Sequence, residues 1–104
     1  LNSIKIGSSM NFEHQDNATK GEFFLNNDAG QCIAEISYLW RDDQTIIADH
    51  TWVDDSLRGQ GVARKLLDHL ADFAREKSVK IVPTCSYVVV MFKREPTAFN
   101  DVAA

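Results

Sequence analysis

Two glycines stand at the start of the best predicted helix in this chain, within Arg58-Gly59-Gln60-Gly61-Val62-Ala63. Glycine inside a helix costs about 1 kcal/mol relative to alanine, and it is favoured after a helix rather than at its start. We therefore interpret the pair as positions that leave backbone N–H groups bare for an anion at the positive end of the helix dipole. The alternative is a surface turn in which the glycines are incidental.

The glycine turn matches neither of two common phosphate-binding motifs. No Gly-Lys-Ser/Thr follows at the spacing of a P-loop, and Gly59-x-Gly61 is followed by Arg64 where the dinucleotide fingerprint needs a third glycine. Its expected position, after a strand and before a helix, is nevertheless the context that a phosphate-binding turn requires. The sequence therefore predicts, first, the binding of a phosphorylated ligand.

Three further side chains can take part in catalysis, namely His50, Cys85 and Tyr87. The near-neutral pKa of histidine suits a general base, and a strand histidine bonded to backbone is the alternative. A lone cysteine is usually a small buried hydrophobe, but Cys85 follows a predicted strand and can lie where ligands bind at a sheet end. Tyr87 can act as a proton donor or be a core tyrosine.

The sequence shows no spacing typical of a metal site. Cys32 and Cys85 lie far apart and the histidines are scattered, so we expect no metal cofactor. The pairs Asp42-Asp43 and Asp54-Asp55 fall in predicted turns, where aspartate is common, and they receive no catalytic role. Cys32 is interpreted as a core residue.

The composition is that of one globular domain. The chain has 104 residues, and 44% of them are hydrophobic, which is enough to build a core. A net charge of −4 weighs against nucleic acid as a partner, and no apolar run approaches the roughly 18–20 residues of a membrane span. We expect a single cytoplasmic domain over residues 1–104 with reduced thiols. Because Leu1 is not an initiator, residues 1–9 are expected to include foreign sequence, with Met10 a candidate natural start.

Hydrophobic periodicity predicts an antiparallel meander followed by a βαβ unit. Residues 1–19, and the polar segment 10–20 in particular, are expected to be loop or a frayed edge. Strands are predicted over 21–25, 32–40 and 45–53, with turn formers between them. Apolar residues at helical spacing over 62–74 and a short strand over 79–82 complete the βαβ unit, with its two strands parallel. The valine-rich segment 87–94 can be strand or helix, and its length and the stop at Pro96 favour a helix.

The glycine turn resembles the acyl-CoA signature of the GNAT superfamily of N-acetyltransferases. That signature, (Arg/Gln)-x-x-Gly-x-(Gly/Ala), lies between a strand and a helix, and Arg58, Gly61 and Ala63 fill its fixed positions. The match extends beyond the turn over residues 20–102. The chain resembles a small, single-domain branch of this superfamily at three further places. These are His50-Thr51-Trp52-Val53 before the signature, Pro83-x-Cys85-x-Tyr87 after it, and Pro96 near the end.

The resemblance implies an α/β (α+β) fold, a mostly antiparallel twisted sheet with a central βαβ unit and one principal helix. It also implies acetyl-CoA or CoA as a cosubstrate. Backbone N–H groups over residues 59–63 would hold the CoA pyrophosphate, and the strand ending at Val53 would pair with the pantetheine arm and diverge from the strand at 79–82. Arg64 and Lys65 either face the phosphates or form a solvated helix face. The implied cofactor-binding residues are Thr51, Val53, Arg58, Gly59, Gln60, Gly61, Val62, Ala63 and Arg64.

The activity implied by the resemblance is acetyl transfer from acetyl-CoA to an amine of a small molecule or peptide. In this branch the cysteine that matches Cys85 lies near the thioester, so Cys85 either accepts the acetyl group or lines the pocket while the amine attacks directly. We favour the pocket role. His50 is the candidate partner of the thiol and the candidate base, and Tyr87 is the candidate acid.

Two other functions compete with the acetyltransferase hypothesis. A CoA-binding module without catalysis is favoured by the small size and by Trp52 and Glu95, which stand where close relatives often carry an acidic residue and histidine. A small interaction domain would instead expose an apolar patch around Trp40 or Trp52. A homodimer that completes the acceptor site is a further expectation, whereas nucleic acid and membranes are not expected partners.

Overall fold

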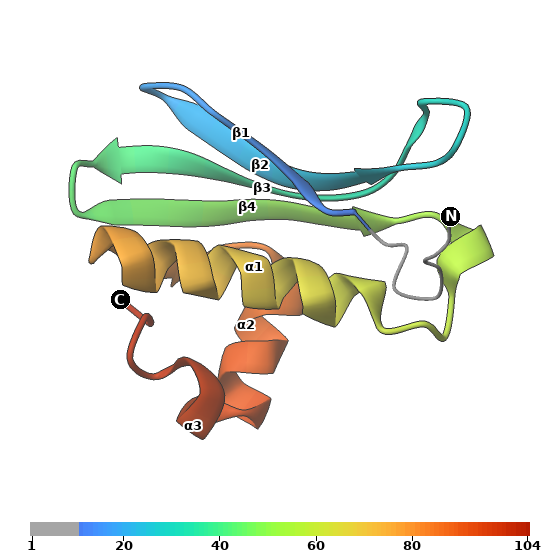
Figure 1. The fold of residues 1–104 in the computed structure, drawn as a ribbon. Coiled ribbons are helices and arrows are strands. Elements are labelled where there is room, and N and C mark those ends of the chain that lie inside the picture. The colour runs from blue at the N-terminus through green and yellow to red at the C-terminus, as the bar shows by residue number, and fades with distance from the viewer. Residues whose placement is uncertain (1–10) are drawn as a thin grey trace.

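The computed structural model describes residues 11–104, and its strands form one five-stranded sheet in the order β1-β2-β3-β4-β5 (Figure 1). The strands are β1 (Glu13–Asp16), β2 (Lys20–Asn26), β3 (Cys32–Asp42), β4 (Thr45–Val53) and β5 (Lys80–Pro83). The helices are the 3-10 helix η2 (Asp55–Leu57), α1 (Val62–Lys77), α2 (Ser86–Arg94) and α3 (Pro96–Phe99). Strands β1 to β4 are antiparallel neighbours and β5 pairs in parallel with β4, which confirms the predicted meander and βαβ unit. The expectations for residues 1–9 and Met10 lie outside the described residues.

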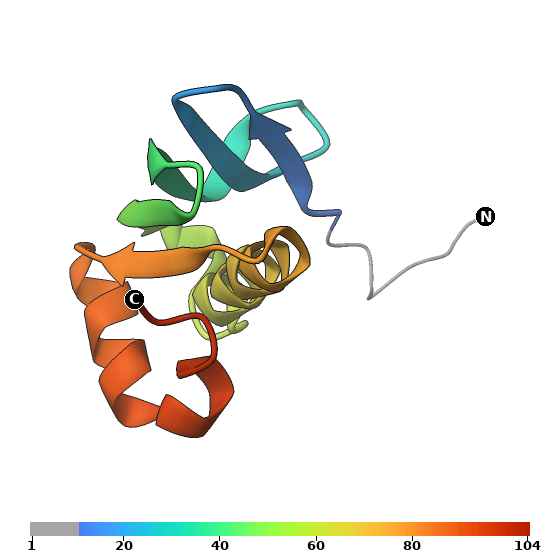
Figure 2. The ribbon, with the colours of Figure 1, turned by 90° about the vertical axis from the view of Figure 1, so that its left-hand side faces the viewer.

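The α-helices pack on one face of the sheet, and no described helix covers the opposite face (Figures 1 and 2). Alternate residues of the central strands, such as Ile36 and Ala48, are fully buried under α1. The strand pairing places the intervening residues on the other side, which we call the open face. The open face of β2, β3 and β4 carries Lys20, Glu22, Phe24, Glu35, Ser37, Leu39, Ile47, His50 and Trp52.

The helix predicted over residues 62–74 is α1, and its predicted apolar face is buried. Leu66, Leu67, Leu70 and Ala71 are all fully buried and form a wide stripe around the helix. The wide stripe lets α1 contact the sheet and also the C-terminal helices. The ambiguous segment 87–94 is helical, as favoured, because α2 buries Val88 and Met91 at helical spacing. None of the helices within residues 11–104 is long and apolar enough to cross a membrane.

Two sequence expectations are wrong. Within the segment expected to be loop or a frayed edge, residues 13–16 form a paired edge strand, β1. All four of its side chains are exposed, so no hydrophobic alternation marks the strand. Cys32 is exposed rather than part of the core. Its strand pairs through Ala34 with Leu25 and through Cys32 with Asn26, so the unpaired residue between them is a bulge that interrupts the alternation.

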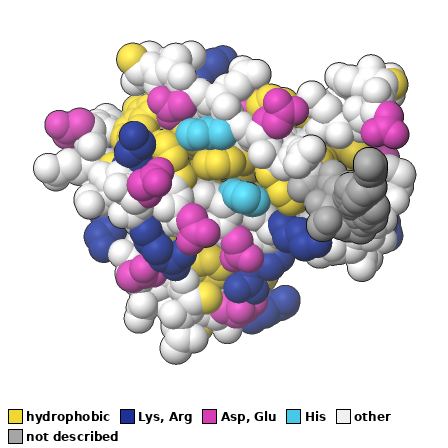
Figure 3. Space-filling model, viewed as in Figure 1, with side chains coloured by type: hydrophobic (Ala, Val, Ile, Leu, Met, Phe, Trp, Pro, Cys, Tyr) yellow, Lys and Arg dark blue, Asp and Glu magenta, His cyan; other side chains and the backbone are white. Residues whose placement is uncertain are grey.

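Strand β1 is held in place by a polar network around Tyr38. The buried Tyr38 hydroxyl donates to the Asp16 carboxylate and lies 2.8 Å from His14 Nε2, while Trp40 Nε1 donates to the same carboxylate at 3.0 Å. Burial and the bond to Asp16 raise the pKa of Tyr38. The His14 ring also stacks on Phe23 at 4.1 Å between centroids, and two histidine side chains flank a hydrophobic surface in Figure 3. Side-chain contacts therefore secure a strand that has no apolar pattern of its own.

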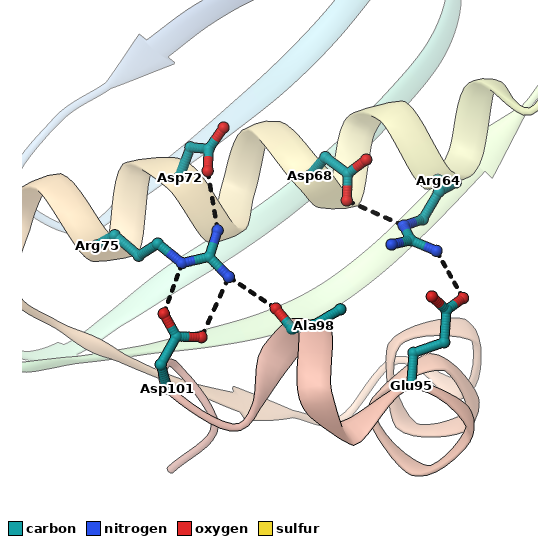
Figure 4. Close-up of polar contacts among 7 residues, drawn as sticks. All are labelled: Arg64, Asp68, Asp72, Arg75, Glu95, Ala98 and Asp101. Atoms are coloured by element: carbon teal, nitrogen blue, oxygen red, sulfur yellow. Dashed lines mark hydrogen bonds and ion pairs between the residues drawn. The ribbon is translucent and has the colours of Figure 1, made fainter.

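The C-terminal segment is tied to α1 by Arg75 (Figure 4). Arg75 Nε donates to Asp101 Oδ2 at 2.6 Å, and Arg75 Nη2 donates to the Ala98 carbonyl at 2.7 Å. Val102 and Ala104 then pair by backbone hydrogen bonds with Ile81 of β5. Acidic and basic side chains interleave over this helical half of the molecule (Figure 3). The tie closes the sheet edge beside β5 and fixes α2 and α3 against α1.

Removing the Asp101 carboxylate is expected to make the free energy of unfolding depend less on pH in the acid range. The hydrogen bond from Arg75 lowers the pKa of Asp101 below its ordinary value. The bond therefore stabilises the folded state fully above the ordinary pKa of about 3.9 and is lost as the pH falls through the lower folded value. In urea unfolding at pH 2 to 6, Asp101→Asn should lower the free energy of unfolding at pH 6 and converge with the wild type at low pH.

The matched control for that series is Asp28→Asn, in the turn between β2 and β3. Its profile should run parallel to that of the wild type. Parallel profiles for Asp101→Asn and the wild type would contradict the role given to Arg75.

Candidate functional site

The chain between β4 and α1 is a turn that only glycine adopts without strain at two positions. Asp54 starts it by accepting a hydrogen bond from the Ser56 amide at 3.0 Å, and η2 follows. Gly59 (φ +84°) and Gly61 (φ +68°) have left-handed backbone, which favours glycine. A Cβ at either position would meet no atom within 4 Å. The glycines are thus needed for the backbone conformation, and the space over them is open.

The N-terminus of α1 presents backbone amides without a partner inside the helix. The first intrahelical bond runs from the Lys65 amide to the Gly61 carbonyl at 3.1 Å, so the amides of residues 62–64 precede it. Within residues 11–104 no side chain caps this helix, and its first turn holds no acidic residue. The Gln60 amide is different, because it donates to the Leu57 carbonyl at 3.2 Å. Uncapped amides at a helix start fit an anion such as a pyrophosphate.

The two arginines near this turn differ in how firmly they are held. The Arg58 side chain is 80% exposed, and within the described residues its ion pair is with the neighbouring Asp55 at 2.8 Å, so it can turn toward a ligand. Arg64 donates to Asp68 at 2.9 Å and to Glu95 at 2.5 Å (Figure 4). These bonds, that to Glu95 first, raise the pKa of Arg64. The predicted phosphate-binding role of Arg64 therefore competes with a structural one, since it joins α1 to the end of α2.

Strands β4 and β5 part at Ala48. Their parallel pairing runs from Thr45 with Lys80 to Ala48 with Pro83. The Ala48 carbonyl then accepts from the amides of Thr84 (3.1 Å) and Cys85 (3.0 Å) and from Thr84 Oγ1 at 3.1 Å. Beyond this point the described chain gives residues 50–53 of β4 partners in β3, and none of residues 49–53 a partner in β5. An open backbone edge therefore leads from the parting point toward the glycine turn.

A β-bulge lies at the same point of β4. Ser37 pairs with His50 and Tyr38 pairs with Ala48, which leaves Asp49 without a partner in β3. Asp49 Oδ1 accepts a hydrogen bond from Ser37 Oγ at 2.8 Å. Bulges often re-aim side chains beside active sites. Neither the bulge nor the hydroxyl bond from Thr84 to Ala48 has a pattern that could be read from one sequence.

Cys85 and Thr51 meet where the strands part. Cys85 is the N-cap residue of α2 and is half-buried, and its Sγ lies 3.3 Å from Thr51 Oγ1. Thr51 pairs with Ile36, which is fully buried under α1, so the pair lies on the helix-covered side of the sheet. Among residues 11–104, a hydroxyl rather than an acid or a base contacts this thiol.

The structure does not bring His50 to Cys85. His50 pairs with Ser37 on the open face and is exposed, so the backbone of β4 separates it from the thiol. Tyr87 lies in the first turn of α2 and is half-buried, and burial raises its pKa. Its hydroxyl has no hydrogen-bond partner within the described chain, so it can donate to a ligand. The candidate base and the candidate acid are therefore presented from different sides of β4.

This arrangement suits a long ligand with an anion at one end and a reactive group at the other. The uncapped start of α1 receives the anion, and the open edge of β4 over residues 49–53 offers backbone groups to an extended arm. The arm then ends near Thr51, Cys85 and Tyr87. Three separate features thus line one path along the molecule.

The comparisons with known proteins agree with this geometry. A family model described as GCN5-related N-acetyl-transferase matches residues 22–102. Protein NATD1 of Xenopus tropicalis is 29% identical over 92% of this chain and 86% of its own length. The solution structure of a GCN5-like candidate N-acetyltransferase from Staphylococcus aureus is 37% identical, with 88% of this chain and 87% of that chain covered and a TM-score of 0.68.

A ligand-bound protein is also similar. The GNAT family N-acetyltransferase YhbS of Escherichia coli, in complex with CoA, is 26% identical to this chain, with a TM-score of 0.54. The match covers 61% of this chain and 38% of that one. The match of the family model to most of this chain decides the assignment. The chain belongs to the GCN5-related N-acetyltransferase family.

Proposed function

We propose that this protein is an N-acetyltransferase that moves the acetyl group of acetyl-CoA to an amine. Family membership supports acyl transfer in general. The observation in this chain that carries the proposal is the uncapped start of α1 beneath the open space over Gly59 and Gly61. CoA carries a pyrophosphate, and the positive end of a helix dipole with bare amides binds such an anion.

The rest of CoA can follow the path described above. We propose that the amides of Gly59, Gly61, Val62 and Ala63 hold the pyrophosphate, with Arg58 turning toward it from the surface. The Gln60 amide joins them only by leaving the Leu57 carbonyl. The pantetheine arm would pair with the open edge of β4, and the thioester would lie in the gap where β4 and β5 part, with Thr51 and Cys85 on its helix-covered side and the open face of the sheet on its other side. The CoA bound by the similar E. coli protein supports this cosubstrate.

In the proposed reaction the amine attacks the thioester directly. Its nitrogen forms a bond to the acetyl carbon while the carbon–sulfur bond breaks, and CoA leaves as a thiolate. Backbone N–H groups on the open edge of β4 can polarise the carbonyl. His50 can take the proton from an amine that arrives over the open face. Tyr87, whose phenol is protonated at neutral pH, can give a proton to the thiolate.

The contacts of Cys85 favour a pocket role over a covalent one. A nucleophilic cysteine needs a neighbouring base or a lowered pKa, and the contact on Sγ within the described chain is the Thr51 hydroxyl. Cys85→Ala should therefore keep kcat within about tenfold of the wild type, compared with losses of about 10⁴-fold or more for the removal of a true nucleophile. Steady-state release of CoA measures this, with Cys32→Ala as the exposed-cysteine control. A loss of several thousandfold confined to Cys85→Ala would establish the acetyl-cysteine route instead.

A mixture of candidate amines incubated with acetyl-CoA tests the function itself. We expect mass spectrometry to show an amine that gains an acetyl group only when the protein is present. Tight binding of CoA with no product would remove the enzyme claim and leave a CoA-binding module. An absence of CoA binding would remove both.

The third hypothesis, an interaction domain, predicted an exposed apolar patch around Trp40 or Trp52. Trp40 is half-buried and its Nε1 is hydrogen-bonded to Asp16. Trp52 is 39% exposed on the open face, and its cross-strand partner in β3 is the acidic Glu35. Its polar neighbour suits a ligand-binding wall better than a dry protein interface.

A further inference from the structure

The open face of the sheet carries a cavity of about 430 Å³ beside the parting point of β4 and β5. Side chains and backbone of β1, β2, β3 and β4 line it, among them Gln15, Glu22, Glu35, Ser37 and Asp49. This volume is within the range of sites that take small organic ligands and is too small for a folded partner. No described helix covers this face (Figures 1 and 2), so a ligand can enter from solvent.

The charges that line the cavity are mainly negative. The lining includes the acidic residues Asp16, Glu22, Glu35 and Asp49 and the basic Lys20, but the strand pairing places the Asp16 side chain in the row of Gly21 and Tyr38 on the helix-covered side. Asp16 already accepts from Tyr38 and Trp40, whereas burial and the neighbouring Glu35 carboxyl raise the pKa of Glu22. Two adjacent carboxyl groups that disfavour each other's charge are stabilised by a cation placed between them.

The cavity reaches the proposed reaction centre through Asp49. This residue lines the cavity and is also the bulge residue at which β4 leaves β5. Glu22, Ser37 and His50 form one row across β2, β3 and β4. Neighbouring strands lie about 4.8 Å apart, so about 10 Å separates the backbone of Glu22 from that of His50. A short chain that bears a cation at each end fits between the two.

We propose that this cavity binds the acceptor and that the acceptor is an aliphatic diamine. One ammonium lies between Glu22 and Glu35, and the other amine lies at Asp49 and His50. The second ammonium gives one proton to His50, and its nitrogen then forms the bond to the acetyl carbon as the carbon–sulfur bond of acetyl-CoA breaks. The nitrogen loses its second proton to solvent, and the CoA thiolate takes a proton from Tyr87, which solvent reprotonates. The inference rests on the proposed function for this last step, whereas the binding of the dication is independent of it.

Binding without acetyl-CoA tests the cavity directly. The backbone amide spectrum of the ¹⁵N-labelled protein is followed while 1,4-diaminobutane or, as the matched monoamine, butylamine is added. We expect the largest shifts at Glu22, Glu35 and Ser37, and at least tenfold tighter binding of the diamine. Glu22→Gln and Glu35→Gln should each weaken the diamine at least fivefold, while Glu76→Gln, exposed on α1, should not. Equal affinity for the two amines, or shifts elsewhere, would overturn the proposal.

Turnover then separates this inference from the proposed function. With acetyl-CoA present, the diamine should have a kcat/KM at least tenfold above that of butylamine, and Glu35→Gln should raise KM for the diamine with little change in kcat. Equal kcat/KM values for both amines would refute the diamine and leave an acetyltransferase. Diamine binding at this face with no acetylation of any amine would refute the transferase and the acceptor role together.

Discussion

Gly61→Asp is expected to raise the dissociation constant for CoA at least tenfold. Gly61 has a left-handed backbone, and a Cβ at this position would meet no atom within 4 Å. Aspartate tolerates that backbone better than most residues, so the turn should survive. Its carboxylate would then lie over the amides proposed for the pyrophosphate and repel it. A tenfold change corresponds to about 1.4 kcal/mol, and calorimetry with CoA measures it.

The matched control for this substitution is Gly30→Asp. Gly30 also has a positive φ (+81°) and open space around it, but it lies in the turn between β2 and β3. The affinity of Gly30→Asp for CoA should equal that of the wild type. Both variants share any loss of stability that comes from placing aspartate in left-handed backbone. Undiminished binding by Gly61→Asp would show that CoA does not use this turn.

Gly21→Ala is expected to destabilise the fold by about 2 kcal/mol. A Cβ on Gly21 would lie 2.3 Å from the Tyr38 hydroxyl oxygen, 2.4 Å from its ring carbon Cζ and 2.8 Å from the Gln15 carbonyl oxygen. Alanine gains about 0.5–1 kcal/mol over glycine in a strand, whereas overpacking a filled core costs about 1–3 kcal/mol or more. Because a ring and a backbone oxygen both stand in the way, the steric cost decides the sign. Urea unfolding measures the difference.

A double-mutant cycle isolates the clash between Gly21 and Tyr38. In a Tyr38→Val background the ring is gone, so Gly21→Ala should cost much less than in the wild type. An equal cost in both backgrounds would mean that the contact with Tyr38 does not exclude a side chain at position 21. Retained stability in Gly21→Ala would contradict the close packing of β2 over Tyr38.

Most of the fold could be predicted from the sequence because the buried faces of its helices and strands require apolar residues at regular spacing. The apolar face over residues 62–74 and the alternation over 32–40 correspond to buried stripes of α1 and β3. The segment 87–94 was harder, since valine suits both states, but Val88 and Met91 stand one helical turn apart and are buried together. Strand β1 has no such pattern because its side chains are exposed. Pairing with β2 and the bonds of His14 and Asp16 to the side chains of Tyr38 and Trp40 hold it in the sheet.

The sequence predicted the part of the candidate site that depends on backbone conformation. It did not predict the part that depends on the pairing register of β4 with β3. The glycine turn was identified by its unusual composition, and the structure adds a second cause, the left-handed backbone of Gly59 and Gly61. The predicted contact between His50 and Cys85 required the His50 side chain to lie on the face of β4 that Cys85 contacts. The bulge at Asp49 shifts that register by one residue, and a shift of one exchanges the two faces of a strand. No local pattern in one sequence marks such a bulge.

The central claim is that backbone amides at the start of α1 hold the pyrophosphate of CoA. A titration of the ¹⁵N-labelled protein with CoA, read at each backbone amide, tests it most directly. The account predicts that Gly59 and residues 61–64 shift most, followed by the open edge of β4 over residues 49–53, with β1 unchanged. Saturation by CoA with unmoved amides at residues 59–64 would contradict it.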